Sequence, residues 1–186
     1  MAGTLSVQKI QGLASSAAPT TVEIASGHKL SGAAGSIVAP GHIIQCVNST
    51  LAGGSDASTT QSYISTGNTL NITPKQSNSK IRVSFSHVIR ITPGTNHTRA
   101  DVRLRETTTN TTILEYLYFG EELTDGGKDP ILPISGTGVF TTSNISQKTF
   151  DLQFRKANGE ANQATNIYYK WYTGATFTMD AMEIAQ

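Results

Sequence analysis

The stretch from Lys80 to Ile91 constrains the fold of this chain more than any other part of the sequence. Its first seven residues read K-I-R-V-S-F-S, so apolar and polar side chains alternate strictly. A period of two places the apolar side chains on one face of an extended chain, which is typical of a half-buried antiparallel strand. The alternation changes phase at His87–Ile89, which predicts a bulge or a bend between two sheets. We therefore interpret Lys80–Ile91 as the central strand of a β-sandwich.

Similar short stretches recur along the chain from His42 onward. They alternate clearly at Phe150–Arg155 and at Thr176–Ala181, and turn-forming segments separate them. One such segment contains Asn158-Gly159, a strong signal for a β-hairpin because both residues tolerate positive φ. The predicted strands are 42–48, 61–65, 69–72, 80–91, 99–106, 111–119, 131–140, 148–155, 167–172 and 176–184. Many short strands without a helical period between them predict an all-β fold, a jelly-roll β-sandwich.

Composition excludes some functional classes. Charged residues make up 15% of the 186 residues and the formal net charge is +1, which argues against a protein that binds nucleic acid through clustered Lys and Arg. The single cysteine, Cys46, excludes a disulfide framework and a zinc site built from cysteines. It lies in the apolar run I-I-Q-C-V, which favours a small buried side chain over a reactive thiol.

Residues 1–40 differ from the rest and are interpreted as an extended N-terminal arm, for attachment or as a stalk. Residues 41–186 form the predicted jelly-roll head domain. The arm has short apolar patterns but no segment that could bury a core alone, so we expect it to become ordered only against other chains. The alternative is a disordered leader. The side chains expected to dock are Leu5, Val7, Ile10, Val22 and Ile24.

Several functional signatures are absent from the sequence. The beginning of the chain lacks the basic and apolar segments of a secretory signal peptide, and no apolar run approaches the roughly 18 residues of a membrane-spanning helix. No H-E-x-x-H, G-x-S-x-G or P-loop motif occurs, so we expect no enzymatic activity. The four histidines are isolated, and we expect neither a metal site nor a cofactor. Carboxylates around Asp125 could hold calcium or form a glycosidase pair, but a plain surface loop is favoured.

The densest aromatic set of the chain lies at residues 168–172. Ring faces stack on sugars, and exposed Tyr and Trp suit binding surfaces. Strand alternation assigns Tyr169 and Trp171 to the core or to a subunit interface, and it leaves Tyr168 and Tyr172 open between packing and binding. Loops on a rigid scaffold often carry binding residues. The candidate receptor or sugar contacts are Tyr168, Tyr172, Asp125, Lys128 and Asn158.

Four segments resemble a known family. V-E-I-A-S-G-H-K-L begins at Val22, G-S-I-V at Gly35 is followed by I-I-Q-C-V at Ile43, L-N-I-T-P-K-Q-S-N-S-K-I-R-V begins at Leu70, and M-D-A-M-E-I-A begins at Met179. Together they resemble stretches of tail-fibre and virion proteins of marine, cyanophage-like bacteriophages. The likeness runs from about residue 20 to the C-terminus.

The resemblance implies a structural protein of the phage virion with a trimeric jelly-roll head and no catalytic residues. It favours a short tail fibre, or a fibre tip, that attaches the particle to its host. The expected partners are two further copies of the chain, other virion proteins that the arm contacts, and a polysaccharide or receptor of the host surface. A capsid decoration or head-fibre protein that clamps coat subunits is the alternative, and a polysaccharide depolymerase is a third.

Overall fold

A computed structural model describes residues 39–54, 56–92, 98–121, 131–157, 166–170 and 174–186, together with Ser26. Val38–Gln186 forms one compact unit, separate from residues 1–37. Within the described part of the chain, no helix is long and apolar enough to cross a membrane. The arm and its boundary at residue 40 stay predictions, because nearly all of the arm lies outside the described residues. The same holds for its proposed docking side chains, Leu5, Val7, Ile10, Val22 and Ile24.

Every regular element of the described residues is a β-strand. Residues with β-branched, aromatic or aliphatic side chains at every second position form these strands, as the alternation predicts. The strands are β1 (Ile43–Ala52), β2 (Ala57–Ser58), β3 (Ile64–Ile72), β4 (Lys80–Thr92), β5 (Thr98–Glu106), β6 (Thr111–Glu121), β7 (Ile131–Thr141), β8 (Lys148–Lys156), β9 (Asn166–Tyr168) and β10 (Thr176–Ile184).

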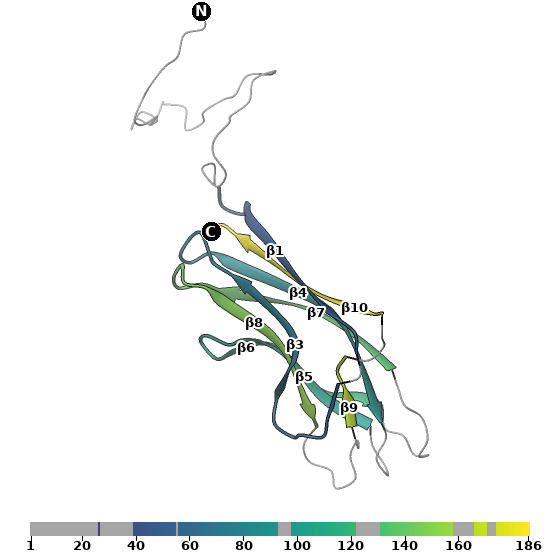
Figure 1. Cartoon of the computed structure of the whole chain (residues 1–186). Helices are drawn as coiled ribbons and strands as arrows, with labels where there is room; N and C mark the ends of the chain where they lie inside the picture. The colour runs from purple at the N-terminus through teal and green to yellow at the C-terminus, as the bar shows by residue number, and fades with distance from the viewer. Residues whose placement is uncertain are drawn as a thin grey trace, which may run out of the picture. The chain divides into compact units, whose positions relative to one another are not determined.

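The strands form two antiparallel sheets that pack as a sandwich (Figure 1). One sheet has the order β1-β10-β4-β9-β2, with β7 also paired to β4, and the other has the order β3-β8-β5-β6. When the short β2 and β9 are left out, eight long strands remain, and they can be counted from one to eight in chain order. One sheet, β1-β10-β4-β7, then has the order 1-8-3-6, and the other, β3-β8-β5-β6, has the order 2-7-4-5. That is the strand order of a jelly roll. The predicted fold class is confirmed.

The predicted central strand is confirmed as β4, which pairs with β7 along one side and with β10 and then β9 along the other. The predicted phase slip is wrong, because the register with β7 is unbroken and burial alternates along the whole strand. His87 occupies an inward position and is only 1% exposed. A polar residue is tolerated there because its ring stacks on Phe177 and its Nε2 bonds to a backbone carbonyl.

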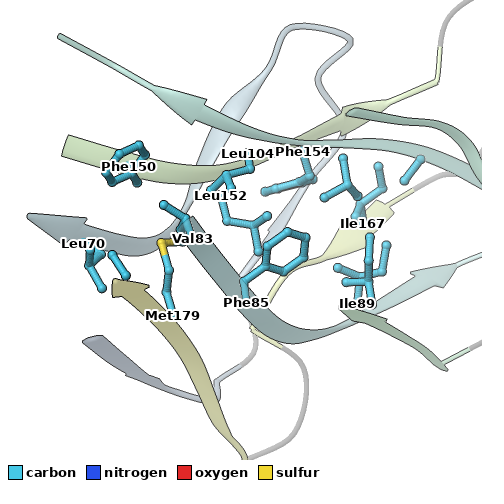
Figure 2. Close-up of a cluster of buried hydrophobic side chains, with 14 of the residues drawn as sticks. Leu70, Val83, Phe85, Ile89, Leu104, Phe150, Leu152, Phe154, Ile167 and Met179 are labelled. Carbon is cyan, nitrogen blue, oxygen red and sulfur yellow. The ribbon is translucent and has the colours of Figure 1, made fainter. Parts of the chain in front are cut away.

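Side chains from both sheets meet in one hydrophobic core between the layers (Figure 2). Phe85 on β4 lies across from Leu104, Leu152 and Phe154 of the other sheet, and all four are buried. Along β7, Ile134 belongs to the core, while side chains of β6 lie directly against Gly136 and Gly138. The two sheets are therefore held together chiefly by apolar burial.

Three local predictions need correction. The segments predicted at 61–65 and 69–72 are not two strands: one strand, β3, runs from Ile64 to Ile72, and its register shifts where Gly67 adopts a φ of 83°. Cys46 is exposed instead of buried, because Val47 takes the inward position of β1 beside it. The hairpin predicted at Asn158-Gly159 does not pair β8 with β9, which belong to different sheets, and the two residues themselves lie outside the described residues.

The two ends of the sandwich differ. Residues 39–42 lead into β1 beside the C-terminus, where the Gly41 amide donates to the Ala185 carbonyl at 2.9 Å. Strand β4 starts at this end beside Ile184 and finishes at the far end beside Asn166. The strand ends that flank residues 93–97, 122–130, 158–165 and 171–173 all lie at that far end (Figure 1). We call it the loop end.

Candidate functional site

Among the predicted receptor contacts, only Tyr168 falls within the described residues. Asp125, Lys128, Asn158 and Tyr172 lie outside them, so their role stays a prediction. Tyr168 ends β9 at the loop end and is partly exposed. It shares the outer face of its sheet with its cross-strand neighbour Arg90, whose guanidinium carbon lies 5.3 Å from the ring centroid. This geometry is that of a cation–π contact.

Tyr169 points the other way, as the alternation predicts. Its ring packs on Phe154 with centroids 4.5 Å apart, so it belongs to the edge of the core. The alternation predicts the same role for Trp171, which lies outside the described residues. Lys170, which directly follows Tyr169, forms an ion pair of 2.7 Å with Asp56. The sequence pattern does not indicate this pair.

A cluster of polar and charged side chains lies on the outer face of the β3-β8-β5-β6 sheet. Its centre is Tyr63, just before β3, whose hydroxyl donates to Glu115 at 2.6 Å. The guanidinium carbons of Arg103 and Arg155 lie 3.8 and 4.4 Å from the centroid of its ring. Burial, together with the hydrogen bond to Glu115, raises the pKa of Tyr63 above its usual value. The phenol therefore stays protonated.

The rest of the cluster links β5 and β8. Arg155 pairs with Asp101 at 2.8 Å, and Arg103 donates to Gln153 at the same distance. Gln153 in turn donates to Asp151, and burial raises the pKa of Asp151. Because acidic and basic side chains alternate and bond to one another, the face has little excess charge to attract nucleic acid. Planar polar groups around an aromatic ring could instead contact the hydroxyl groups of a sugar.

The outer face of the β1-β10-β4-β7 sheet, which we call the β4 face, has a different character. It carries a shallow hollow of about 460 Å³ with Cys46, Asp180 and Met182 in its lining. Three large apolar side chains of this face are more than half exposed: Ile43 at 58%, Ile131 at 55% and Val139 at 55%. Cross-strand pairing places them there, since side chains of paired residues lie on the same face.

No metal centre emerges in the described residues. They contain no group of three or more His, Cys, Asp or Glu side chains that could hold an ion. His42 accepts a hydrogen bond from the Ala39 amide, and His87 is buried in the sandwich. The other two histidines and the carboxylates near Asp125 lie outside the described residues.

Comparison with known proteins identifies no family. No family model and no curated protein matches the sequence. Among solved structures, the chain is similar to the VP2 subviral particle of infectious bursal disease virus, with 15% identity over 85% of this chain and a TM-score of 0.39. A structure of the Gx strain of that virus has 16% identity over 77% of this chain and a TM-score of 0.36. This chain spans 37% of the length of each.

Proposed function

We propose that this chain is a non-enzymatic structural protein of a bacteriophage virion, a short trimeric tail fibre or fibre tip for host attachment. The observation that carries the proposal is the separation of the two ends of the jelly roll. Residues 39–42 lead into β1 beside the C-terminus, and the strand ends that flank four connecting segments lie at the loop end. Such a molecule can dock on the particle through one end and meet a host surface with the other. Jelly rolls also build capsid and lectin domains.

The β4 face supports association between copies of the chain. Ile43, Ile131 and Val139 would remain in water in a monomer, and burying them against another chain is favourable. Arg82 and Asp180 project from adjacent strands of this face, so it offers both charges to a second copy of itself. Three copies would also bring weak contacts at the loop end together, which gives avidity. We assign the β4 face to the contact between subunits of a homotrimer.

The native mass tests this assignment. Light scattering of the purified chain should give about three times its 19.8 kDa, and Val139→Lys should shift the protein toward monomer because it places a charge in the contact. Leu117→Lys is the matched control, since Leu117 is 54% exposed but lies on β6 of the other sheet. A monomeric wild type, or an equal effect of both substitutions, would contradict the assignment.

The attachment role is tested at the loop end. Tyr168→Ala should weaken adsorption of the purified protein to host cells about 10-fold or more, because exposed aromatic anchors dominate many binding surfaces and the trimer multiplies the loss. Ile145→Ala, an exposed apolar change at the other end of the sandwich, should adsorb as the wild type does. Unchanged adsorption of Tyr168→Ala would remove this residue from the proposed contact.

The second candidate is a capsid decoration protein whose arm clamps coat subunits. The exposed apolar β4 face would then cover coat protein instead of a copy of the chain. Antibody labelling of intact particles separates the two functions. Labels at the tail are expected for the attachment protein, and labels distributed over the head would favour decoration.

A further inference from the structure

A short segment at the loop end joins the two layers of the sandwich. It consists of Tyr169 and Lys170, directly after β9, and we call these two residues the strap. The Tyr169 ring packs on Phe154 of one sheet, while its carbonyl oxygen lies 2.5 Å from Nε2 of His87 in the other. Few other bonds hold the strap. The Tyr169 amide donates to the Asp56 carbonyl at 3.1 Å, and the Gly54 amide donates to the Lys170 carbonyl. Lys170 also pairs with the Asp56 carboxylate at 2.7 Å.

The imidazole of His87 lies beneath the strap, 1% exposed, with its ring centroid 4.2 Å from that of Phe177. Because the partner of Nε2 is a carbonyl oxygen, Nε2 carries the hydrogen and donates it. Nδ1 is then the bare nitrogen, and it is buried without a hydrogen-bond partner among the described residues. A second proton would have to sit on Nδ1, where it meets no acceptor.

The described surroundings of His87 offer no compensation for a positive charge. The neighbouring strands contribute Phe177 from β10 and Ile134 from β7, which are both apolar. The strap contributes the aromatic ring of Tyr169 and the ammonium of Lys170, which pairs with the Asp56 carboxylate. No carboxylate of the described residues forms an ion pair with the imidazole. Burial accordingly lowers the pKa of His87 from 6.5 to about 4.

We propose that Tyr169 and Lys170 form an acid-released strap, in which proton uptake by His87 favours the state with the strap lifted and water at the imidazole. The bistable element is the strap itself, since its few bonds to Gly54, Asp56 and His87 can break while the long strands stay paired. Release would change the surface presented at the loop end. The inference depends only on the contacts of His87 and is independent of the proposed function.

Linkage sets the sign and the size of the effect. In the lifted state the imidazole is solvated and titrates near 6.5, so between pH 6.5 and 4 the lifted state binds more protons than the closed state. Acid therefore favours lifting, and the closed strap is fully favoured only above about pH 6.5. The ratio of lifted to closed molecules should rise about 20-fold from pH 7 to pH 5, and about 300-fold at most.

Hydrogen exchange of the full-length chain at pH 7 and pH 5 tests the proposal. After correction for the intrinsic exchange rate, the opening constants of the Gly54 and Tyr169 amides, which donate to Lys170 and Asp56, should rise about 20-fold. Amides in the middle of β4, such as that of Val83, should not change. An equal rise at Val83 would mean global unfolding and would overturn the proposal, as would no rise at Gly54 and Tyr169.

Two variants isolate the imidazole. His87→Gln keeps a neutral donor for the Tyr169 carbonyl, and His87→Phe keeps a ring against Phe177. Both should lose the 20-fold response whatever their absolute protection, since neither takes up a proton. A response that persists in either variant would overturn the proposal. If neither variant folds, NMR titration of His87 in the wild type tests the proposal instead. An imidazole that titrates near 6.5 while the strap is closed would overturn it, because protonation would then not favour release of the strap.

Discussion

Glu183→Gln should lower the free energy of unfolding by about 3 kcal/mol, because it leaves several buried donors with a poor partner. Glu183 lies on β10 and its side chain is 0% exposed. Its carboxylate accepts hydrogen bonds of 2.6–3.1 Å from four groups: the amides of Lys75 and Gln76, the Ser79 hydroxyl and the Gln45 side-chain amide. It thus fixes the turn between β3 and β4, and a glutamine would set its own NH2 group against some of these donors.

Urea unfolding at pH 7 measures the loss. Glu115→Gln is the matched control, because Glu115 is exposed and accepts one hydrogen bond from Tyr63. The Glu115→Gln substitution should lower the free energy of unfolding by less than about 1 kcal/mol, because contacts between exposed charged groups contribute little to stability. Equal losses for the two variants would show that the Glu183 carboxylate does not organise the turn.

The same carboxylate makes stability depend on pH. Burial by itself would raise the pKa of Glu183, but the hydrogen bonds from Lys75, Ser79 and Gln76 outweigh burial and lower it. The folded state therefore binds fewer protons than the unfolded state below about pH 4.5, so stability is lost as the pH falls through the folded pKa. The Glu183→Gln protein should show a flatter decline between pH 4.5 and pH 3.

Gly136→Val should also lower the free energy of unfolding by about 3 kcal/mol, because the larger side chain overfills the core where β7 meets β6. A Cβ at Gly136 would lie 2.6 Å from Cδ2 of Leu114 and 2.9 Å from Cε1 and Cζ of Phe85. Phe85 is buried among side chains of both sheets (Figure 2) and has no free space to move into. The sheets would have to separate locally to accept the larger residue.

Thr137→Val on the same strand is the control for this substitution. Thr137 is exposed on the outer face, so the same β-branched side chain should change stability by no more than about 0.5 kcal/mol there. Thermal unfolding of both variants under the same conditions decides the comparison. A Gly136→Val protein as stable as Thr137→Val would contradict the close approach of β6 to β7.

Period-two alternation is a local property, and it located the long strands well. Lys80–Ile91 became β4 and the segment 148–155 became β8, with their alternate apolar side chains in the core. The pattern works because each strand of a sandwich has one face against the other sheet, so the inward positions must be apolar. The all-β class and the main body of the core could therefore be predicted from the residues.

Local reasoning failed where a distant partner decides the role of a residue. The alternation predicts a bulge or a bend at His87–Ile89, but Phe177 and the Tyr169 carbonyl make His87 acceptable in the core of a regular strand. Asn158-Gly159 carries hairpin chemistry, yet its flanking strands belong to different sheets. Cys46 was grouped with an apolar run, although the phase of β1 turns it outward.

The candidate sites show the same division. The alternation predicts that Tyr168 and Tyr169 face opposite ways, and Tyr168 is partly exposed, while its role in binding stays a prediction. The polar cluster around Tyr63 could not be predicted, since Tyr63 precedes β3, its partners come from β5, β6 and β8, and they meet only in the folded sheet. Sequence alone determined which residues form strands and which face of each is apolar, because both depend on neighbours along the chain. Tertiary structure decided strand order, the buried histidine, the strap and the polar cluster, because these depend on residues brought together by long-range pairing.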